Sequence, residues 1–175
     1  MNKKVPGSGR KKTSKLPPAK TRHRRARAGE GSFGLVGYCV HGKSKAEAAP
    51  NPLSPAQLIQ AVQGGLPLAE LEALQESLAV PMARLVPKLG ISKSTLHRRK
   101  AQGRLDPAES DRVLRFARLM GKAVEVLESE ENARRWLDSP QVGLGGAVPL
   151  DFAVTEIGAR EVEDLLGRID YGVYS

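Results

Sequence analysis

The stretch PMARLVPKLGISKSTLHRRKAQGRL, residues 81–105 of a 175-residue chain, has the pattern of two helices joined by a tight turn. Apolar residues recur at helical spacing from Met82 to Leu89, which predicts a short first helix. Gly90 then permits a sharp turn, and the Ser92 side chain can accept hydrogen bonds from the first amides of a second helix. We therefore expect a helix, a turn and a second helix in this order.

The second of these helices is strongly cationic. Between Val80 and Leu105 the chain has seven basic residues and no acidic residue. Ile91 and Leu96 suffice to hold the helix in place, so the rest of its surface can donate hydrogen bonds to a ligand. This pattern favours the recognition helix of a helix-turn-helix, which reads base edges with its first turn and meets phosphates with later basic residues. The candidate DNA-binding residues are Ser92, Lys93, Ser94, Thr95, His97, Arg98, Arg99, Lys100 and Arg104.

A solvated cationic helix without a ligand is the simpler alternative, because a run of charge usually marks an exposed face. The absence of acidic residues and the helix–glycine–helix spacing favour DNA binding instead. Pro87 is an irregularity, since it removes the hydrogen bond to the carbonyl of Ala83 and predicts that the first helix is short.

Capping residues predict further helices on both sides of this pair. Upstream, Ser54-Pro55 begins one helix that ends at Gly64-Gly65, and a second begins at Pro67. Downstream, Asp106 caps a long helix, and Glu109 can complete a capping box there. The expected fold class is all-α.

The long helix over 107–128 has a broad apolar face. We expect it to be buried on two sides or to pair with a copy of itself, and a dimer surface on this face would suit a symmetric operator. A short helix containing Trp136 follows and ends at Asp138-Ser139-Pro140, before a glycine-rich loop over 141–148. The last predicted helix spans Thr155–Ile169.

Charge is distributed unevenly along the chain, whose net value is +9. Residues 1–50 hold 13 basic and 2 acidic residues, and residues 51–105 have a net charge of +4. Residues 106–175 reverse the sign, with 8 basic and 14 acidic residues. This gradient favours a polyanion at the N-terminal side and a different kind of partner at the C-terminal side.

The N-terminal segment combines eleven Lys or Arg within residues 1–30 with little apolar bulk, which predicts a disordered basic arm. Such an arm either neutralises phosphates or only aids solubility. Phe33–Val40 is a glycine-rich apolar patch, either a short strand or a docking segment, and a linker follows. The expected organisation is a disordered basic arm and linker over 1–52, a helix-turn-helix domain over 53–105 and a helical domain over 106–175.

Composition excludes several classes of protein. Cys39 is the only cysteine, so an intramolecular disulfide is impossible and a reducing cytosol is expected. No apolar run approaches the roughly 20 residues that span a bilayer, and no membrane partner is expected. Three histidines and one cysteine supply no catalytic or metal-binding constellation. We expect no enzymatic activity, no cofactor and no metal.

The C-terminal part carries a distinctive series of motifs. Arg134-Arg135-Trp136-Leu137 is followed by Gly145-Gly146, Pro149-Leu150, Thr155, Gly158, Val162, Leu165-Leu166, Ile169 and Gly172. With these motifs at this spacing, the last 70 residues resemble the toxin-binding domain of the Xre/MbcA/ParS antitoxin family. Together with the block ISKSTLHRRK-x-x-GRL, the resemblance covers roughly residues 66–173 and leaves residues 1–52 outside.

The resemblance implies a cytoplasmic antitoxin of a type II toxin–antitoxin system. Its C-terminal domain, 106–175, would dimerise and neutralise a RES-type toxin that depletes NAD, within a larger toxin–antitoxin complex. Its helix-turn-helix would bind operator DNA and repress the operon. The resemblance also implies that the C-terminal helix and tail approach the toxin active site. The candidate toxin-binding residues are Gly145, Gly146, Pro149, Arg160, Glu163, Arg168, Asp170, Tyr171, Gly172 and Tyr174.

Two alternatives remain at this point. The glycines of the loop can serve ordinary turn chemistry, and core packing is favoured over toxin contact for Val162, Leu166 and Ile169. The whole chain could also be a stand-alone transcriptional regulator or nucleoid-associated protein whose C-terminal domain only dimerises. A toxin that co-purifies at stoichiometric yield would separate the two functions.

Overall fold

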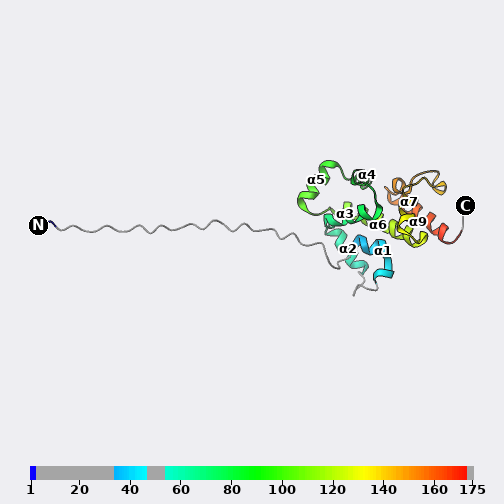
Figure 1. The fold of residues 1–175 in the computed structure, drawn as a ribbon, viewed down its shortest axis with the longest axis horizontal. Helices are drawn as coiled ribbons and strands as arrows, with labels where there is room; N and C mark the ends of the chain where they lie inside the picture. The colour runs from blue at the N-terminus through cyan, green and yellow to red at the C-terminus, as the bar shows by residue number, and fades with distance from the viewer. Residues whose placement is uncertain (3–33, 47–53, 173–175) are drawn as a thin grey trace. The chain divides into compact units, whose positions relative to one another are not determined.

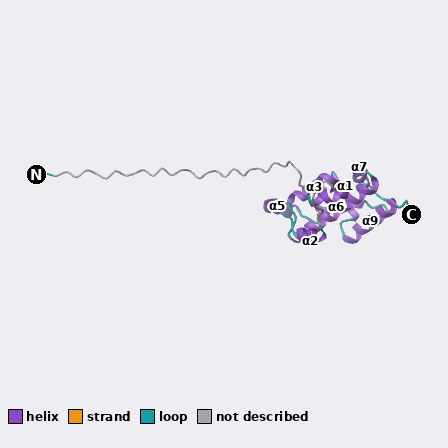
Figure 2. Cartoon of the chain, turned by 90° about the horizontal axis from the view of Figure 1, so that it is seen from below, coloured by secondary structure: helices purple, strands orange, loops and turns teal. Residues whose placement is uncertain are grey.

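The computed structural model describes residues 1–2, 34–46 and 54–172. The helices are α1 (Leu35–Ala46), α2 (Pro55–Gln63), α3 (Leu68–Leu78), α4 (Met82–Lys88), α5 (Lys93–Gln102), α6 (Pro107–Leu127), α7 (Glu130–Leu137), the 3-10 turn η1 (Val142–Leu144), α8 (Pro149–Phe152) and α9 (Glu156–Asp170) (Figure 1). The described ranges contain no strand, and Figure 2 shows helices joined by loops. The predicted all-α fold class is confirmed.

The capping residues act as the sequence predicts. The Ser54 hydroxyl accepts a hydrogen bond from the Gln57 amide, and Asp106 and Glu109 form a reciprocal capping box at the start of α6. Thr155 caps α9 by accepting from the Gly158 amide at 3.1 Å. Pro87 lies inside α4, which is only seven residues long, as expected.

Helix α6 lies at the centre of the unit Ser32–Ser175 and packs against α1, α2, α3, α7 and α9. Its apolar side chains Val113, Phe116, Ala117, Leu119, Met120 and Ala123 are buried by these helices. The expectation of burial on two sides is confirmed. The idea that this face is a dimer surface is wrong, because helices of the same chain already cover it.

Helix α1 corrects the prediction for residues 1–52. Leu35–Ala46 is neither a strand nor a linker but a helix, with Val36 and Val40 buried in the core. The Glu70 carboxylate accepts hydrogen bonds from the amides of Leu35 and Val36 at 3.0 and 2.9 Å. The core contacts of Val36 and Val40 and the Glu70 cap stabilise the helix. The rest of the arm and linker, residues 3–33 and 47–53, lies outside the described residues.

A glycine permits the close approach of α1 to α6. A Cβ atom on Gly121 would lie only 2.0 Å from the carbonyl oxygen of Cys39. Any larger side chain would therefore push the two helices apart. Burial raises the pKa of the Cys39 thiol in this contact, the effect of nearby Arg118 being smaller and opposite.

Candidate functional site

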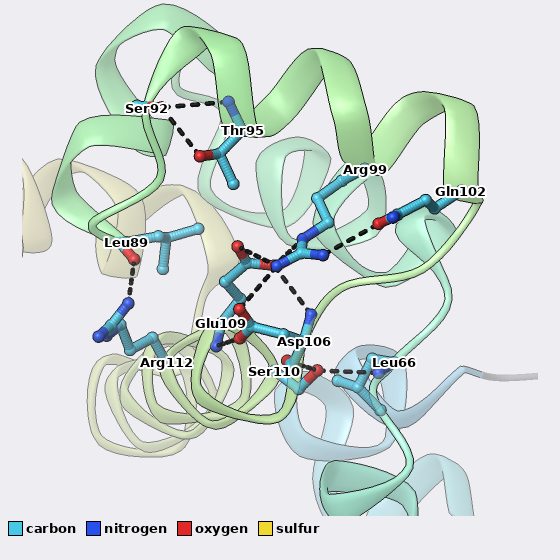
Figure 3. Close-up of polar contacts among 10 residues, drawn as sticks. All are labelled: Leu66, Leu89, Ser92, Thr95, Arg99, Gln102, Asp106, Glu109, Ser110 and Arg112. Atoms are coloured by element: carbon cyan, nitrogen blue, oxygen red, sulfur yellow. Dashed lines mark hydrogen bonds and ion pairs between the residues drawn. The ribbon is translucent and has the colours of Figure 1, made fainter.

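The turn between α4 and α5 is fixed by backbone and side-chain hydrogen bonds. Gly90 has φ +66°, and the Ile91 amide donates to the carbonyl of Val86 at 3.0 Å. The Arg112 guanidinium donates to the carbonyl of Leu89 at 3.0 Å, which ties the turn to α6 (Figure 3). Ile91 is buried and Leu96 is half-buried, so α5 is held on one side only. The predicted helix-turn-helix is therefore present, with α5 in the position of the recognition helix.

The first turn of α5 is capped and open to solvent. The Ser92 hydroxyl accepts from the Thr95 amide at 3.1 Å, and the same hydroxyl lies 2.9 Å from the Thr95 hydroxyl (Figure 3). This cap occupies Ser92 and half-buried Thr95. The candidate DNA-binding residues that remain exposed on the helix are Lys93, Ser94, His97, Arg98 and Lys100.

Arg99, in contrast, is engaged inside the chain. Its Nε donates to Glu109 Oε2 at 2.7 Å and its Nη2 donates to Asp106 Oδ2 at 2.7 Å (Figure 3). The side chain of Arg99 is only 13% exposed, and that of Glu109 only 6%. The hydrogen bond with Glu109 raises the pKa of Arg99 above its ordinary value, so the guanidinium stays charged. We assign Arg99 to holding the C-terminal end of α5 on the start of α6.

Arg104 also bonds within the chain. Its Nη2 donates to the carbonyls of Gly65 and Gly64 at 2.7 and 3.2 Å. The neighbouring Leu105 amide donates to the carbonyl of Leu66 at 2.8 Å. Arg104 therefore helps to join the α5–α6 connection to the loop between α2 and α3.

Ser110 also links the start of α6 to the loop between α2 and α3. This role of Ser110 was not predicted from the sequence. Ser110 is fully buried, accepts from the Leu66 amide at 2.8 Å and donates to the Asp106 carbonyl at 2.6 Å (Figure 3). The second role of Glu109 was also missed, although its capping role was predicted. Arg99 lies 10 residues from Glu109 across a helix break, and no helical periodicity signals such a pair.

The candidate toxin-binding residues differ in exposure. Gly145 and Gly146 are exposed and adopt φ values of +65° and +84°, so the turn itself requires glycine. Pro149 is buried and does not reach the surface. Glu163 is half-buried, with its carboxylate 3.9 Å from the Arg118 guanidinium. The exposed members on α9 and just beyond are Arg160, Arg168, Asp170, Tyr171 and Gly172, and Tyr174 lies outside the described residues.

The inner face of α9 belongs to the core. Val162 and Leu166 are fully buried, and Leu165 is 9% exposed. Ile169 is half-buried against the same cluster. The preference for core packing at Val162, Leu166 and Ile169 is confirmed.

Polar contacts join the helix-turn-helix to the C-terminal helices. Arg84 on α4 forms a bidentate ion pair with Asp138, at 2.6 and 3.2 Å, and Lys88 pairs with Asp151 on α8. The Nε of Arg134 on α7 donates to the carbonyl of Ser77 on α3 at 2.7 Å. With these contacts in place, α5 lies at one end of the unit and α7 and α9 at the other (Figures 1 and 2).

The described ranges contain neither a metal-binding cluster nor a membrane-spanning helix. Residues 34–46 and 54–172 hold no group of three or more His, Cys, Asp or Glu side chains that could bind a metal ion. None of the helices in these ranges has the length and apolar character needed to cross a membrane.

Comparisons with known proteins identify both halves of the unit. Residues 57–118 match the antitoxin Xre-like helix-turn-helix domain, and residues 122–172 match the antitoxin Xre/MbcA/ParS C-terminal toxin-binding domain. The two matches meet inside α6. The predicted boundary between residues 105 and 106 stays a prediction.

Curated relatives support the same assignment. The chain is 35% identical to the Antitoxin Xre of Yersinia enterocolitica over 120 residues, and the aligned region covers 67% of this chain and 81% of the relative. It is 32% identical over 113 residues to the Antitoxin Xre of Photorhabdus laumondii, which covers 63% of this chain and 76% of the relative. With a helix-turn-helix domain, a toxin-binding domain and relatives at this identity, the chain belongs to the Xre/MbcA/ParS family of antitoxins.

Proposed function

We propose that this antitoxin binds operator DNA through the exposed face of α5 and neutralises a cognate RES-type, NAD-depleting toxin through residues 106–175. The observation that supports the DNA half is the placement of Lys93, Arg98 and Lys100. All three are exposed, and none forms an ion pair with another residue in the described part of the chain. Unpaired cations on a presented helix are what phosphate binding requires.

The proposed DNA contacts differ from the full candidate set. Ser94 and His97 lie on the first two turns of α5 beside Lys93, where side chains of a recognition helix reach base edges. We assign the phosphate contacts to Arg98 and Lys100. Ser92, Thr95, Arg99 and Arg104 stay outside the proposed contact set, because hydrogen bonds within the chain use their polar groups. Ser94 stays in the set because its side chain is exposed, although its hydroxyl also lies 2.9 Å from that of Ser92.

Titration of the chain's own promoter fragment tests the DNA half. Fluorescence anisotropy would compare this fragment with a shuffled sequence of equal length, at salt concentrations from about 50 to 200 mM. We expect tighter binding to the promoter at every salt concentration. Equal affinity for both fragments would contradict operator recognition.

The toxin half is supported by the matched toxin-binding domain and by the acidic character of residues 106–175. The RES-type chemistry follows from the resemblance of the sequence. Co-expression with the toxin encoded beside this chain provides the test, with cellular NAD and growth as readouts. We expect the antitoxin to restore both. A toxin that leaves NAD unchanged when expressed alone would contradict the RES assignment.

Deletion of residues 156–175 is a poor test of the toxin half. It would remove Val162 and Leu166 from the core, so loss of protection would also follow from unfolding. Point variants on the exposed face of α9 avoid this ambiguity.

We also propose a cytoplasmic homodimer within a larger complex. Because the apolar face of α6 is buried in its own chain, the contact between copies uses another surface. The molar mass of the isolated chain in solution, measured by light scattering, tests the dimer, and a monomeric mass would contradict it.

A further inference from the structure

The corner between α8 and α9 exposes apolar side chains. Phe152 is 38% exposed, Val154 41% and Ile157 76%. Among the described residues the other large apolar side chains with comparable exposure are Met1, Ile59, Val142 and Tyr171. Exposed apolar side chains that gather at one place on a folded chain mark interaction sites more often than scattered ones do.

The backbone of this corner is held rigidly. A Cβ atom on Gly158 would lie 1.9 Å from the Phe152 carbonyl oxygen, so the first turn of α9 packs directly on the end of α8. Fully buried Ala153 fastens the corner to the core. The Thr155 cap adds a hydrogen bond across the same turn. The exposed side chains are therefore presented on a fixed backbone.

Arg115 of α6 braces the corner from the central helix. Its Nε lies 2.9 Å from Glu156 Oε2, and its Nη1 donates to the Val154 carbonyl at 3.4 Å. A second ion pair, to Asp111 at 3.0 Å, orients the guanidinium. A surface that is ordered before binding loses little conformational entropy when a partner arrives.

The corner continues into the exposed face of α9. Exposed residues recur along this helix at three- to four-residue spacing, which places them on one face: Ile157, Arg160, Glu161, Asp164, Arg168 and Tyr171. The two apolar ends of this stripe, Ile157 and Tyr171, are about 21 Å apart at the helical rise of 1.5 Å per residue. A standard interface covers about 800 Å² on each partner and is broader than this distance, so both ends of the stripe can lie in one interface.

We propose that the corner formed by Phe152, Val154 and Ile157 is an apolar anchor of the toxin-binding surface, and that the toxin offers an apolar pocket to receive it. This inference rests on the proposed function, in which this domain binds the cognate toxin. The choice of the toxin as occupant rests on position, since all three residues lie inside the matched toxin-binding domain, 122–172. A few residues that fill pockets on the partner supply most of the affinity of an interface.

The test uses the full-length antitoxin and the toxin encoded beside it, with affinity measured by biolayer interferometry. Ile157→Asn should weaken binding by about 30-fold or more, the loss typical of a central interface residue. Val154→Asn should weaken binding in the same direction. Ile157→Leu keeps an apolar side chain of equal size and should retain the affinity within about threefold.

Glu72→Gln is the control for toxin affinity, because it changes an exposed side chain on α3, outside the matched toxin-binding domain. Operator affinity and melting temperature should be unchanged in every variant, since Ile157 is mostly exposed. Wild-type toxin affinity in both Asn variants would overturn the inference while leaving the proposed function intact. A lower oligomeric state of the isolated Ile157→Asn chain would also overturn it, by showing that a second copy covers the corner. Failure of the wild-type chain to bind the toxin would overturn both.

Discussion

Helices α5 and α9 are held in the molecule by different forces. Helix α5 has no buried residue, and its C-terminal half is fastened by ion pairs from Arg99 to Asp106 and Glu109. Helix α9 instead buries Gly158, Ala159, Val162, Leu165 and Leu166. The comparison teaches that α5, the helix proposed to bind DNA, is held by half-buried Leu96 and by polar contacts at its ends, whereas the C-terminal helix is part of the hydrophobic core.

Truncation of the core face of α9 should have the largest effect. Leu166→Ala removes a fully buried side chain and should lower the free energy of unfolding by about 2–5 kcal/mol. Urea denaturation measures this change. Asp164→Ala, on the exposed face of the same helix, is the control and should change stability by less than about 0.5 kcal/mol. A loss below about 1 kcal/mol for Leu166→Ala would show that α9 is not held by the core.

One glycine near the start of α9 and one at the end of α5 allow the same comparison of packing. Gly158→Ala places a methyl group against the Phe152 carbonyl and should cost about 1–3 kcal/mol of unfolding free energy. Gly103→Ala at the end of α5 meets no atom within 4 Å, but it forces φ +72° on a side chain, so the cost should be only about 1 kcal/mol. Thermal denaturation of both variants under the same conditions gives the order. The reverse order would contradict the close packing of the α8–α9 corner.

Loss of the ion pairs from Arg99 to Asp106 and Glu109 should affect α5 without unfolding α9. Arg99→Ala leaves the Glu109 carboxylate, which is almost buried, without its cationic partner, so the end of α5 should move away from α6. We expect several-fold weaker operator binding, unchanged toxin affinity and an unchanged dependence of DNA affinity on salt. Arg99→Lys keeps the charge but not the two-pronged geometry and should restore only part of the affinity. A lower salt dependence would instead make Arg99 a phosphate contact.

Arg98, on the exposed side of the same helix, should act on DNA binding directly, unlike Arg99. Arg98→Ala should lower the slope of log affinity against log salt by about one unit, because one phosphate contact and its released counterion are lost. Melting temperature and toxin affinity should stay as in the wild-type chain, since Arg98 is exposed. Anisotropy titrations at several salt concentrations measure the slope. An unchanged slope would remove Arg98 from the proposed DNA interface.

Local sequence signals were sufficient for much of this fold. Caps at Ser54, Ser92 and Asp106 marked the starts of helices correctly, because capping involves residues only three positions apart. The cationic surface of α5 and the apolar stripe of α9 were also predictable, since helical periodicity is a local property.

Long-range contacts settled what such local signals leave open. Leu35–Ala46 is a helix that packs on α6 and is capped by Glu70, whereas its sequence alone left a short strand or a docking segment open. Arg99 looked identical to Arg98 in the sequence, but the fold brings Asp106 and Glu109 to Arg99 and leaves Arg98 in solvent. The starts of most helices, their capping residues and the charge of each helix are thus set by neighbours along the chain. Which apolar face is covered and which cation is free follow from packing, because burial and ion pairing depend on residues that only the folded chain brings together.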